Sequence, residues 1–333
     1  MRRIGVLMCF LACVLIDGAG QESGGYQLIG KIRLTDQEFT RSTIPTVILE
    51  GTRIPFAAET RANLSGQFKF KNLYPDLFTL IVYVPRAGQH QQTVEVSPRL
   101  ADSRKRIHVE VLFQPNLQSK MLRQISSSQL SIPQKAQKEY AKAREKLGRR
   151  DSAAAIAHLK KAVALAPQFL EAWNHLGTLA NASGDFKLAE KYFREALKHD
   201  SDYYPSLVNL GGVLLTQGML GEALPINLAA VQAMPDDALA HSQLGLSYYF
   251  LGKSTEAEKS LQMAVSLDPG HFSYPQLPLA DLYLRKKDFA SAARALEQFV
   301  ELHPDAEQAA AARKELERIR ANWIRDSRFE IRD

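Results

Sequence analysis

The residues that could perform acid–base or metal chemistry are scattered along this chain of 333 residues. His108-Val109-Glu110 imitates the first part of a deaminase zinc site, but the Pro-Cys-x-x-Cys that should follow is missing. The sequence contains no HExxH, GxSxG, P-loop or GxGxxG motif and no acidic calcium loop. Its eight histidines show no ligand spacing. We therefore predict a protein that is not an enzyme and that has no metal or cofactor site.

The amino-terminal residues have the pattern of an export signal. Arg2 and Arg3 precede an apolar stretch, Ile4–Ile16, and three small residues follow at 18–20. Such a stretch forms about 20 Å of helix, less than the ~30 Å hydrocarbon core of a membrane. The pattern predicts a secretory signal peptide at residues 1–20, with cleavage after Gly20 preferred over retention. We expect an exported protein that is periplasmic or associated with the cell envelope.

Both cysteines, Cys9 and Cys13, lie inside this segment. A cleaved chain then has no disulfide and no thiol or zinc-thiolate chemistry. Residues 10–13 faintly resemble the lipobox of bacterial lipoproteins, which makes lipid anchoring an alternative. However, Phe10 stands where Leu is usual, and the apolar run continues beyond Cys13. The signal peptide is the preferred interpretation.

The overall composition is that of an ordinary globular protein. Apolar residues make up 45% of the chain and charged residues 23%, which excludes disorder and a polytopic membrane protein as descriptions of the whole. The length predicts about two domains. With 42 Lys and Arg against 36 Asp and Glu, the net charge is only +6, too slight a surplus to hold a nucleic acid by itself. We predict no nucleic-acid partner and no transmembrane span.

Residues 25–115 alternate between apolar and polar side chains, the pattern of strands with one buried face. The alternation is clearest in Gln27–Leu34, Gln67–Phe70 and Phe78–Tyr83 and is repeated at 46–49 and 108–111. Turn-forming residues separate these segments. About seven short strands of this kind predict an antiparallel β-sandwich.

Two segments of this domain, Gly66–Leu73 and Phe78–Val82, resemble the carboxypeptidase regulatory-like, transthyretin-like sandwich. They share with that family a Gly turn, two inward aromatic residues, a Leu, and an aromatic residue that opens the next strand. Pro75-Asp76-Leu77 departs from the family, which usually has Gly there. The resemblance implies a noncatalytic accessory domain. Binding of carbohydrate or a cell surface through this sandwich is the alternative function of the chain.

Residues 116–133 are rich in Ser and show no sustained alternation, which predicts a linker between two domains. Shortly before it, Arg104-Lys105-Arg106 is the densest basic run of the first domain. Such a run can contact phosphates or anionic lipid headgroups. We interpret it as a solvated turn before the last strand.

Beyond Pro133 the sequence repeats itself every 34 residues. Four sets of residues keep this spacing: Gly177, Gly211 and Gly245; Ala189, Ala223 and Ala257; Ala162, Ala196, Ala230 and Ala264; Pro167, Ser201, Pro235 and Pro269. The period, and motifs such as Trp173-x2-Leu176-Gly177, resemble the tetratricopeptide repeat. The resemblance implies five repeats over residues 134–305, at about 136–169, 170–203, 204–237, 238–272 and 273–305.

Each repeat is expected to form two antiparallel helices that approach where side chains are small, as at Gly177 against Ala196. Asp305–Gln308 has the capping-box pattern and predicts a capping helix at 306–323. The predicted fold class is therefore multidomain, with an N-terminal antiparallel β-sandwich followed by an all-α solenoid.

The resemblance also implies a concave groove lined by the first helix of each repeat. The candidate partner-binding residues are Tyr140, Arg144, Asn174, Thr178, Asn181, Val208, Asn209, Ser242, Leu246, Tyr249, Tyr274 and Asp281. Few of them are charged, so the cationic clamp by which some family members grip an acidic carboxyl terminus is missing. We predict an apolar or neutral partner segment, with Leu246, Tyr249 and Tyr274 as anchors. Asn174 and Asn209 are expected to hold its backbone.

The predicted function is an exported, noncatalytic scaffold that binds a protein or peptide partner in this groove. The alternative for the groove residues is that they pack between repeats or against the first domain. An envelope enzyme with an unrecognised site is a weaker alternative, because His, Ser and carboxylates do not cluster. The sequence specifies neither the partner nor the oligomeric state.

Overall fold

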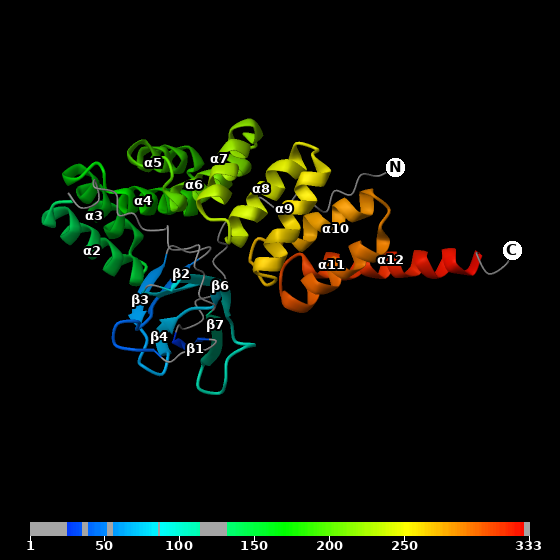
Figure 1. Ribbon diagram of the computed structural model, residues 1–333, viewed down its shortest axis with the longest axis horizontal. Helices are drawn as coiled ribbons and strands as arrows, with labels where there is room; N and C mark the ends of the chain where they lie inside the picture. The colour runs from blue at the N-terminus through cyan, green and yellow to red at the C-terminus, as the bar shows by residue number, and fades with distance from the viewer. Residues whose placement is uncertain (1–24, 35–38, 52–55, 86, 114–131, 330–333) are drawn as a thin grey trace. The chain divides into compact units, whose positions relative to one another are not determined.

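A computed structural model of the protein describes residues 25–34, 39–51, 56–85, 87–113 and 132–329, with side chains up to residue 321 (Figure 1). The predicted signal peptide and most of the predicted linker lie outside these residues. The described chain has a strand region followed by an array of helices, which confirms the predicted fold class. Its internal contacts divide it into two compact units, one up to residue 210 and one from residue 211 on.

The strand region consists of two sheets with a common core. Among the described residues, the strands are β1 (Tyr26–Leu34), β2 (Thr46–Gly51), β3 (Ala57–Arg61), β4 (Gln67–Leu73), β5 (Asp76–Val84), β6 (Gly88–Val96) and β7 (Arg106–Phe113). One sheet has the order β4-β1-β7 and the other has the order β3-β2-β5-β6. Side chains from both sheets, among them Leu28, Phe68 and Leu80, pack into one apolar cluster.

One strand pair departs from the predicted antiparallel arrangement. β1 and β7 run parallel, with Leu28 beside Ile107 and Ile32 beside Val111. The other described pairings are antiparallel. Alternation of side chains predicts which face of a strand is buried, but it carries no information about strand direction. A parallel pair needs a long connection, and here β2 to β6 lie between the two strands in the chain.

The helices follow one another in antiparallel hairpins (Figure 1). The described helices are α2 (Gln134–Gly148), α3 (Ser152–Leu165), α4 (Leu170–Ala182), α5 (Phe186–His199), α6 (Tyr204–Thr216), α7 (Leu220–Ala233), α8 (Ala238–Phe250), α9 (Ser254–Leu267), α10 (Gln276–Arg285), α11 (Phe289–Leu302) and α12 (Ala309–Phe329). Asp151, Asp185 and Asp288 start α3, α5 and α11, because each carboxylate accepts a 3.0 Å hydrogen bond from a first-turn amide. The last helix begins at Ala309, three residues later than its capping-box sequence predicted.

Glycines allow the two helices of a repeat to approach each other. The residue that packs against Gly177 is not the alanine that we predicted. A Cβ on Gly177 would lie 2.4 Å from the Phe193 ring, and one on Gly245 would lie 2.6 Å from Leu261. Gly177 therefore makes room for Phe193 rather than for Ala196. Phe193 and Leu261 are almost completely buried, so a side chain at either glycine would force the helices apart.

Candidate partner-binding surface

Two asparagines on consecutive hairpins, Asn174 of α4 and Asn209 of α6, are in direct contact. The Asn174 Oδ1 atom accepts hydrogen bonds from Asn209 Nδ2 at 3.1 Å and from the Ser206 hydroxyl at 3.2 Å. Ser206 is completely buried, whereas both asparagines are partly exposed. The buried hydroxyl therefore fixes the orientation of the two side chains, which we call the amide pair.

This orientation leaves the Asn174 amino group and the Asn209 carbonyl oxygen of the amide pair available. Among the described residues, none bonds to Asn174 Nδ2 or to Asn209 Oδ1. A peptide unit offers one C=O and one N–H, so a free donor group and a free acceptor suit the groups of a peptide backbone. The structure thus brings together the two predicted backbone-binding residues. Ser206 was not predicted, although its position three residues before Asn209 places it on the same helix face.

The predicted residues on α2 contact other groups of the first unit. Tyr140 lies 4.7 Å from the Phe169 ring and 5.6 Å from the His175 ring. Arg144 forms an ion pair of 3.1 Å with Glu59 of β3. Burial, followed by the charge of Arg144, lowers the pKa of His175 to about 4. The His175 ring is therefore neutral at pH 7.

In the second unit, Tyr249 of α8 and Asp281 of α10 form a closed group with Arg285, which we call the tyrosine cluster. The Tyr249 hydroxyl donates to Asp281 Oδ2 at 2.7 Å and accepts from Arg285 Nη2 at 2.8 Å. Arg285 Nε lies 2.5 Å from the same carboxylate oxygen. Burial and the bond to Asp281 raise the pKa of Tyr249 above its usual range. These groups bond to one another and hold two repeats together.

Arg285 was not predicted, although sequence spacing could have identified it. It follows Asp281 by four residues, the spacing of an ion pair along one helix face. Its guanidinium also lies 5.0 Å from the centre of the Tyr249 ring. The three side chains form one unit, whereas the prediction treated Tyr249 as an anchor for a partner.

Four predicted groove residues are buried, namely Asp281 of the tyrosine cluster and three others. Val208 is 5% exposed, Tyr274 is 8% exposed and Ser242 is 0% exposed. The Tyr274 ring packs 5.2 Å from Phe299, and the Ser242 hydroxyl accepts a hydrogen bond of 2.8 Å from Ser273. These side chains stabilise the repeats and are not accessible to a partner.

The burial of Tyr274 has a local cause. α10 begins only at Gln276, so Tyr274 precedes the helix instead of belonging to it. Its φ angle is +50°, a left-handed conformation that is uncommon for a bulky residue. Pro275 disfavours the helical conformation at the residue before it. The predicted groove position assumed an uninterrupted helix and is corrected here.

The other predicted residues are partly exposed. Leu246 of α8 and Asn181 of α4 both keep part of their surface in solvent. The Thr178 hydroxyl donates to the Asn174 carbonyl oxygen at 3.0 Å and so bonds within its own helix. The Asn181 side chain forms no hydrogen bond with any residue that the structure describes. It therefore serves as a reference for the amide pair, about two turns beyond Asn174 on the same helix.

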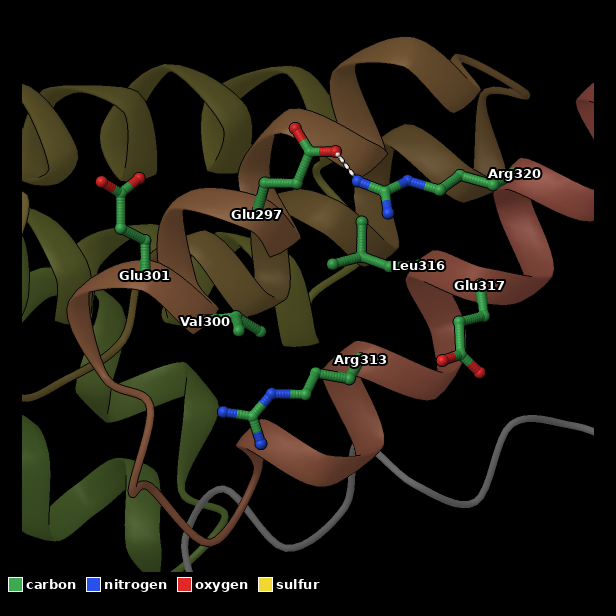
Figure 2. Close-up of a pocket in the computed structure, with 7 residues that line it drawn as sticks. All are labelled: Glu297, Val300, Glu301, Arg313, Leu316, Glu317 and Arg320. Atoms are coloured by element: carbon green, nitrogen blue, oxygen red, sulfur yellow. Dashed lines mark hydrogen bonds and ion pairs between the residues drawn. The ribbon is translucent and has the colours of Figure 1, made fainter.

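A cleft of about 360 Å³ lies between α11 and α12, outside the predicted groove. Figure 2 shows Val300 and Leu316 at its apolar part and Arg320 reaching across to Glu297, at a distance of 2.7 Å. Arg313 donates to a backbone carbonyl group at 2.9 Å. The arginines are thus engaged within the protein, and the cleft is the junction between the last helix and the hairpin before it.

The described part of the chain contains no group of three or more His, Cys, Asp and Glu side chains that could hold a metal ion. None of the described helices has the length and apolar composition needed to cross a membrane. The chemistry that the candidate residues offer is hydrogen bonding by the amide pair and apolar contact by side chains such as Leu246.

Two family profiles match the helical region. The profile of the middle TPR-like domain of cilia and flagella-associated protein 70 matches residues 137–268, and a tetratricopeptide-repeat profile matches residues 277–306. The helical region consists of tetratricopeptide repeats. Neither match extends into the strand region. No curated protein matches the chain.

Several solved structures are similar to part of the chain. MamA (residues 41 to the end) from Desulfovibrio magneticus RS-1 is 28% identical over 53% of this chain and 99% of that chain, with a TM-score of 0.47. YrrB, described as a TPR protein with an unusual peptide-binding site, is 23% identical over 57% and 98%, with a TM-score of 0.46. PilF from Pseudomonas aeruginosa is 24% identical over 60% and 97%, with a TM-score of 0.44.

Proposed function

We propose that the protein is an exported, noncatalytic scaffold whose tetratricopeptide repeats bind a segment of a partner protein. The amide pair is the observation that carries this proposal. Asn174 and Asn209 lie on two consecutive repeats and offer a free donor group and a free acceptor, with Ser206 fixing their orientation. A partner segment in an extended conformation exposes its backbone N–H and C=O groups, so one peptide unit satisfies both free groups.

The proposed partner segment is apolar or neutral. The amide pair is uncharged, and Arg144 in the same unit is already paired with Glu59. His175 is neutral at pH 7 because of its lowered pKa. An acidic segment would therefore find no free cation among the candidate residues of this unit, and the backbone provides the main recognition.

The proposed export rests on the amino-terminal pattern of Arg2, Arg3 and the apolar stretch Ile4–Ile16. We assign the sandwich an accessory role, which its resemblance to carboxypeptidase regulatory-like domains supports. Sequencing the amino terminus of the protein recovered from the cell envelope tests the export: the first residue should be Gln21. An intact Met1 in a cytoplasmic fraction would contradict it.

Selection of short random peptides on the exported form, residues 21–333, tests the amide pair. The double variant Asn174→Ala, Asn209→Ala should bind the selected peptides at least about tenfold more weakly, because two hydrogen bonds are lost. Asn181→Ala is the matched control and should retain full affinity. Circular dichroism checks that both variants fold. Unchanged affinity in the double variant, or an equal loss in the control, contradicts the proposal.

A further inference from the structure

The positive charge of the repeats is concentrated in the first hairpin. Residues 134–165, which form α2 and α3, contain six Lys, three Arg and three acidic residues, a net charge of +6. This value equals the net charge of the whole chain. The next four hairpins, at 170–199, 204–233, 238–267 and 276–302, have net charges of 0, −1, 0 and 0. A cationic surface is therefore a property of this hairpin and not of the repeat.

Five cations, four in α2 and one at its C-cap, lie along one side of the helix. They follow one another at intervals of three or four residues, which places them on one face: Lys135, Lys138, Lys142, Lys146 and Arg149. The apolar residues that α2 buries lie on a different face. Lys146 is partly exposed and the other four are exposed. The row is about 21 Å long at the rise of an α-helix.

The neighbouring helix α3 adds a sixth cation to this row. His158 of α3 lies 2.7 Å from the Glu139 carboxylate of α2, so this face of α3 borders the row. Lys161 follows His158 by three residues, which places it on the same face, and it is exposed. We call the six residues the cationic face: Lys135, Lys138, Lys142, Lys146, Arg149 and Lys161.

Half of the cationic face has an acidic neighbour within the hairpin. The pairs are Lys142 with Glu139 at 2.7 Å, Arg149 with Glu145 at 2.7 Å, and Lys146 with Asp151 at 4.0 Å. Lys135, Lys138 and Lys161 make no ion pair or hydrogen bond with any described residue. These three free cations lie toward the start of α2 and the end of α3.

The free lysines of α2 do not stabilise the helix, so helix stability does not explain their presence. Lys135 lies in the first turn of α2, where the positive end of the helix dipole disfavours a cation, and this turn has no acidic residue. Lys138 lies three residues after Lys135 and four before Lys142, and like charges at these spacings repel each other. Contact with an anionic partner would remove both unfavourable effects.

We propose that the cationic face binds the surface of a bilayer that contains anionic phospholipids. A row of exposed cations along one side of a helix can contact a flat surface along its whole length, and each one adds attraction to negative headgroups. No aromatic side chain is interleaved with the row to stack on nucleic-acid bases, since Tyr140 of α2 packs on Phe169. The cationic face includes no residue of the amide pair, so this proposal stands apart from the proposed function.

Co-sedimentation with vesicles tests the proposal on the exported form, residues 21–333. One set of vesicles contains phosphatidylglycerol and phosphatidylcholine in equal parts, and the other contains phosphatidylcholine alone. The variant Lys135→Gln, Lys138→Gln, Lys161→Gln should bind the anionic vesicles about 100-fold more weakly, because three near-surface cations are lost. The control Lys187→Gln, Lys191→Gln, Lys259→Gln removes the same charge from exposed lysines of α5 and α9 and should change binding about threefold or less.

Equal weakening by both variants would mean that only net charge matters and would overturn the proposal. Unchanged binding of the first variant, or equal binding to the neutral vesicles, would overturn it as well. A short DNA duplex tests the other polyanion: if the chain binds the duplex but not the anionic vesicles, the partner is a nucleic acid and the proposal is wrong. All six substitutions replace exposed side chains that have no hydrogen-bond or ion-pair partner in the part of the chain that the structure describes, and circular dichroism checks that both variants fold.

Discussion

The amide pair and the tyrosine cluster both join side chains on consecutive repeats, yet they differ in what they leave free. In the amide pair, Asn174 Nδ2 and Asn209 Oδ1 have no partner among the described residues. In the tyrosine cluster, the Tyr249 hydroxyl both donates and accepts, and one Asp281 oxygen contacts two partners. The same repeat geometry thus produces an open polar group in one unit and a closed one in the other. Only the open group can recognise another molecule by hydrogen bonds.

The two units can also be compared by a histidine in each whose pKa is lowered by burial. Lowering the pH is expected to change the stability of the protein more than any substitution below. Burial lowers the pKa of His271 to about 3, with a further contribution from His303, and the pKa of His175 is about 4. Unfolded histidine titrates near 6.5, so the stability from the neutral rings is complete above that pH and is lost as the pH falls toward 4. We expect a loss of about 2 kcal/mol per histidine at about pH 5, measured by urea unfolding.

One substitution in each unit separates the contributions of His271 and His175 to the pH dependence of the free energy of unfolding. The Ser273 hydroxyl contacts the His271 ring nitrogen at 2.7 Å, and His271→Asn keeps an acceptor for it. This variant should lose about half of the decrease in the free energy of unfolding that acid causes. His175→Gln should remove the other half. If the free energy of unfolding is the same at pH 7 and pH 5, the two rings do not resist protonation and the assignment is wrong.

Opening the tyrosine cluster should affect stability and not partner binding. Asp281→Ala leaves the Tyr249 hydroxyl and Arg285 without their shared acceptor, and we expect a loss of about 2 kcal/mol in the free energy of unfolding. Tyr249→Phe removes only the hydroxyl and should lose about 1 kcal/mol. Affinity for peptides selected through the amide pair should stay unchanged in both variants. A loss of affinity without a loss of stability would make the tyrosine cluster the binding site instead.

Asn227 is a buried side chain with one hydrogen-bonded atom and one atom that lacks a partner among the described residues. It occupies the repeat position of Phe193 and Leu261 and is completely buried against Gly211. Its Nδ2 atom donates to the Ser247 hydroxyl at 2.8 Å, but its Oδ1 atom has no hydrogen-bond partner among the described residues. Asn227→Leu should stabilise the protein by about 1 kcal/mol, because an unsatisfied buried oxygen is removed. Urea unfolding measures the change, and a less stable variant would show that the hydrogen bond to Ser247 outweighs the unpaired oxygen.

The helical hairpins were predictable because their packing requires particular residue sizes at a fixed period. Gly177 and Gly245 recur at their positions because Phe193 and Leu261 need the space. The strands were harder to predict. β6 begins with polar residues, Gln89–Gln92, that show no alternation, because it is an edge strand of its sheet. The parallel direction of β7 depends on the path of the whole chain and leaves no local pattern.

The candidate site was predictable in part. The repeat positions identified Asn174 and Asn209, but the sequence could not show that Ser206 orients them. The position predicted for Tyr274 was wrong because the repeat pattern was followed and Pro275 was not considered, which disfavours the helical conformation at the residue before it. The cationic face was not predicted, because the net charge was considered only for the whole chain of 333 residues. Residues 134–165 alone hold a net charge of +6.

Side-chain amide resonances of asparagine, observed by two-dimensional nitrogen-15 NMR, test the central claim most directly. Addition of a peptide selected on residues 21–333 should shift the amide signals of Asn174 and Asn209, because their free donor and acceptor bond to its backbone. The signals of the buried Asn227 and of the unpaired Asn181 should stay in place. Signals of Asn174 and Asn209 that do not move at saturating peptide would show that the partner binds elsewhere and would contradict the account.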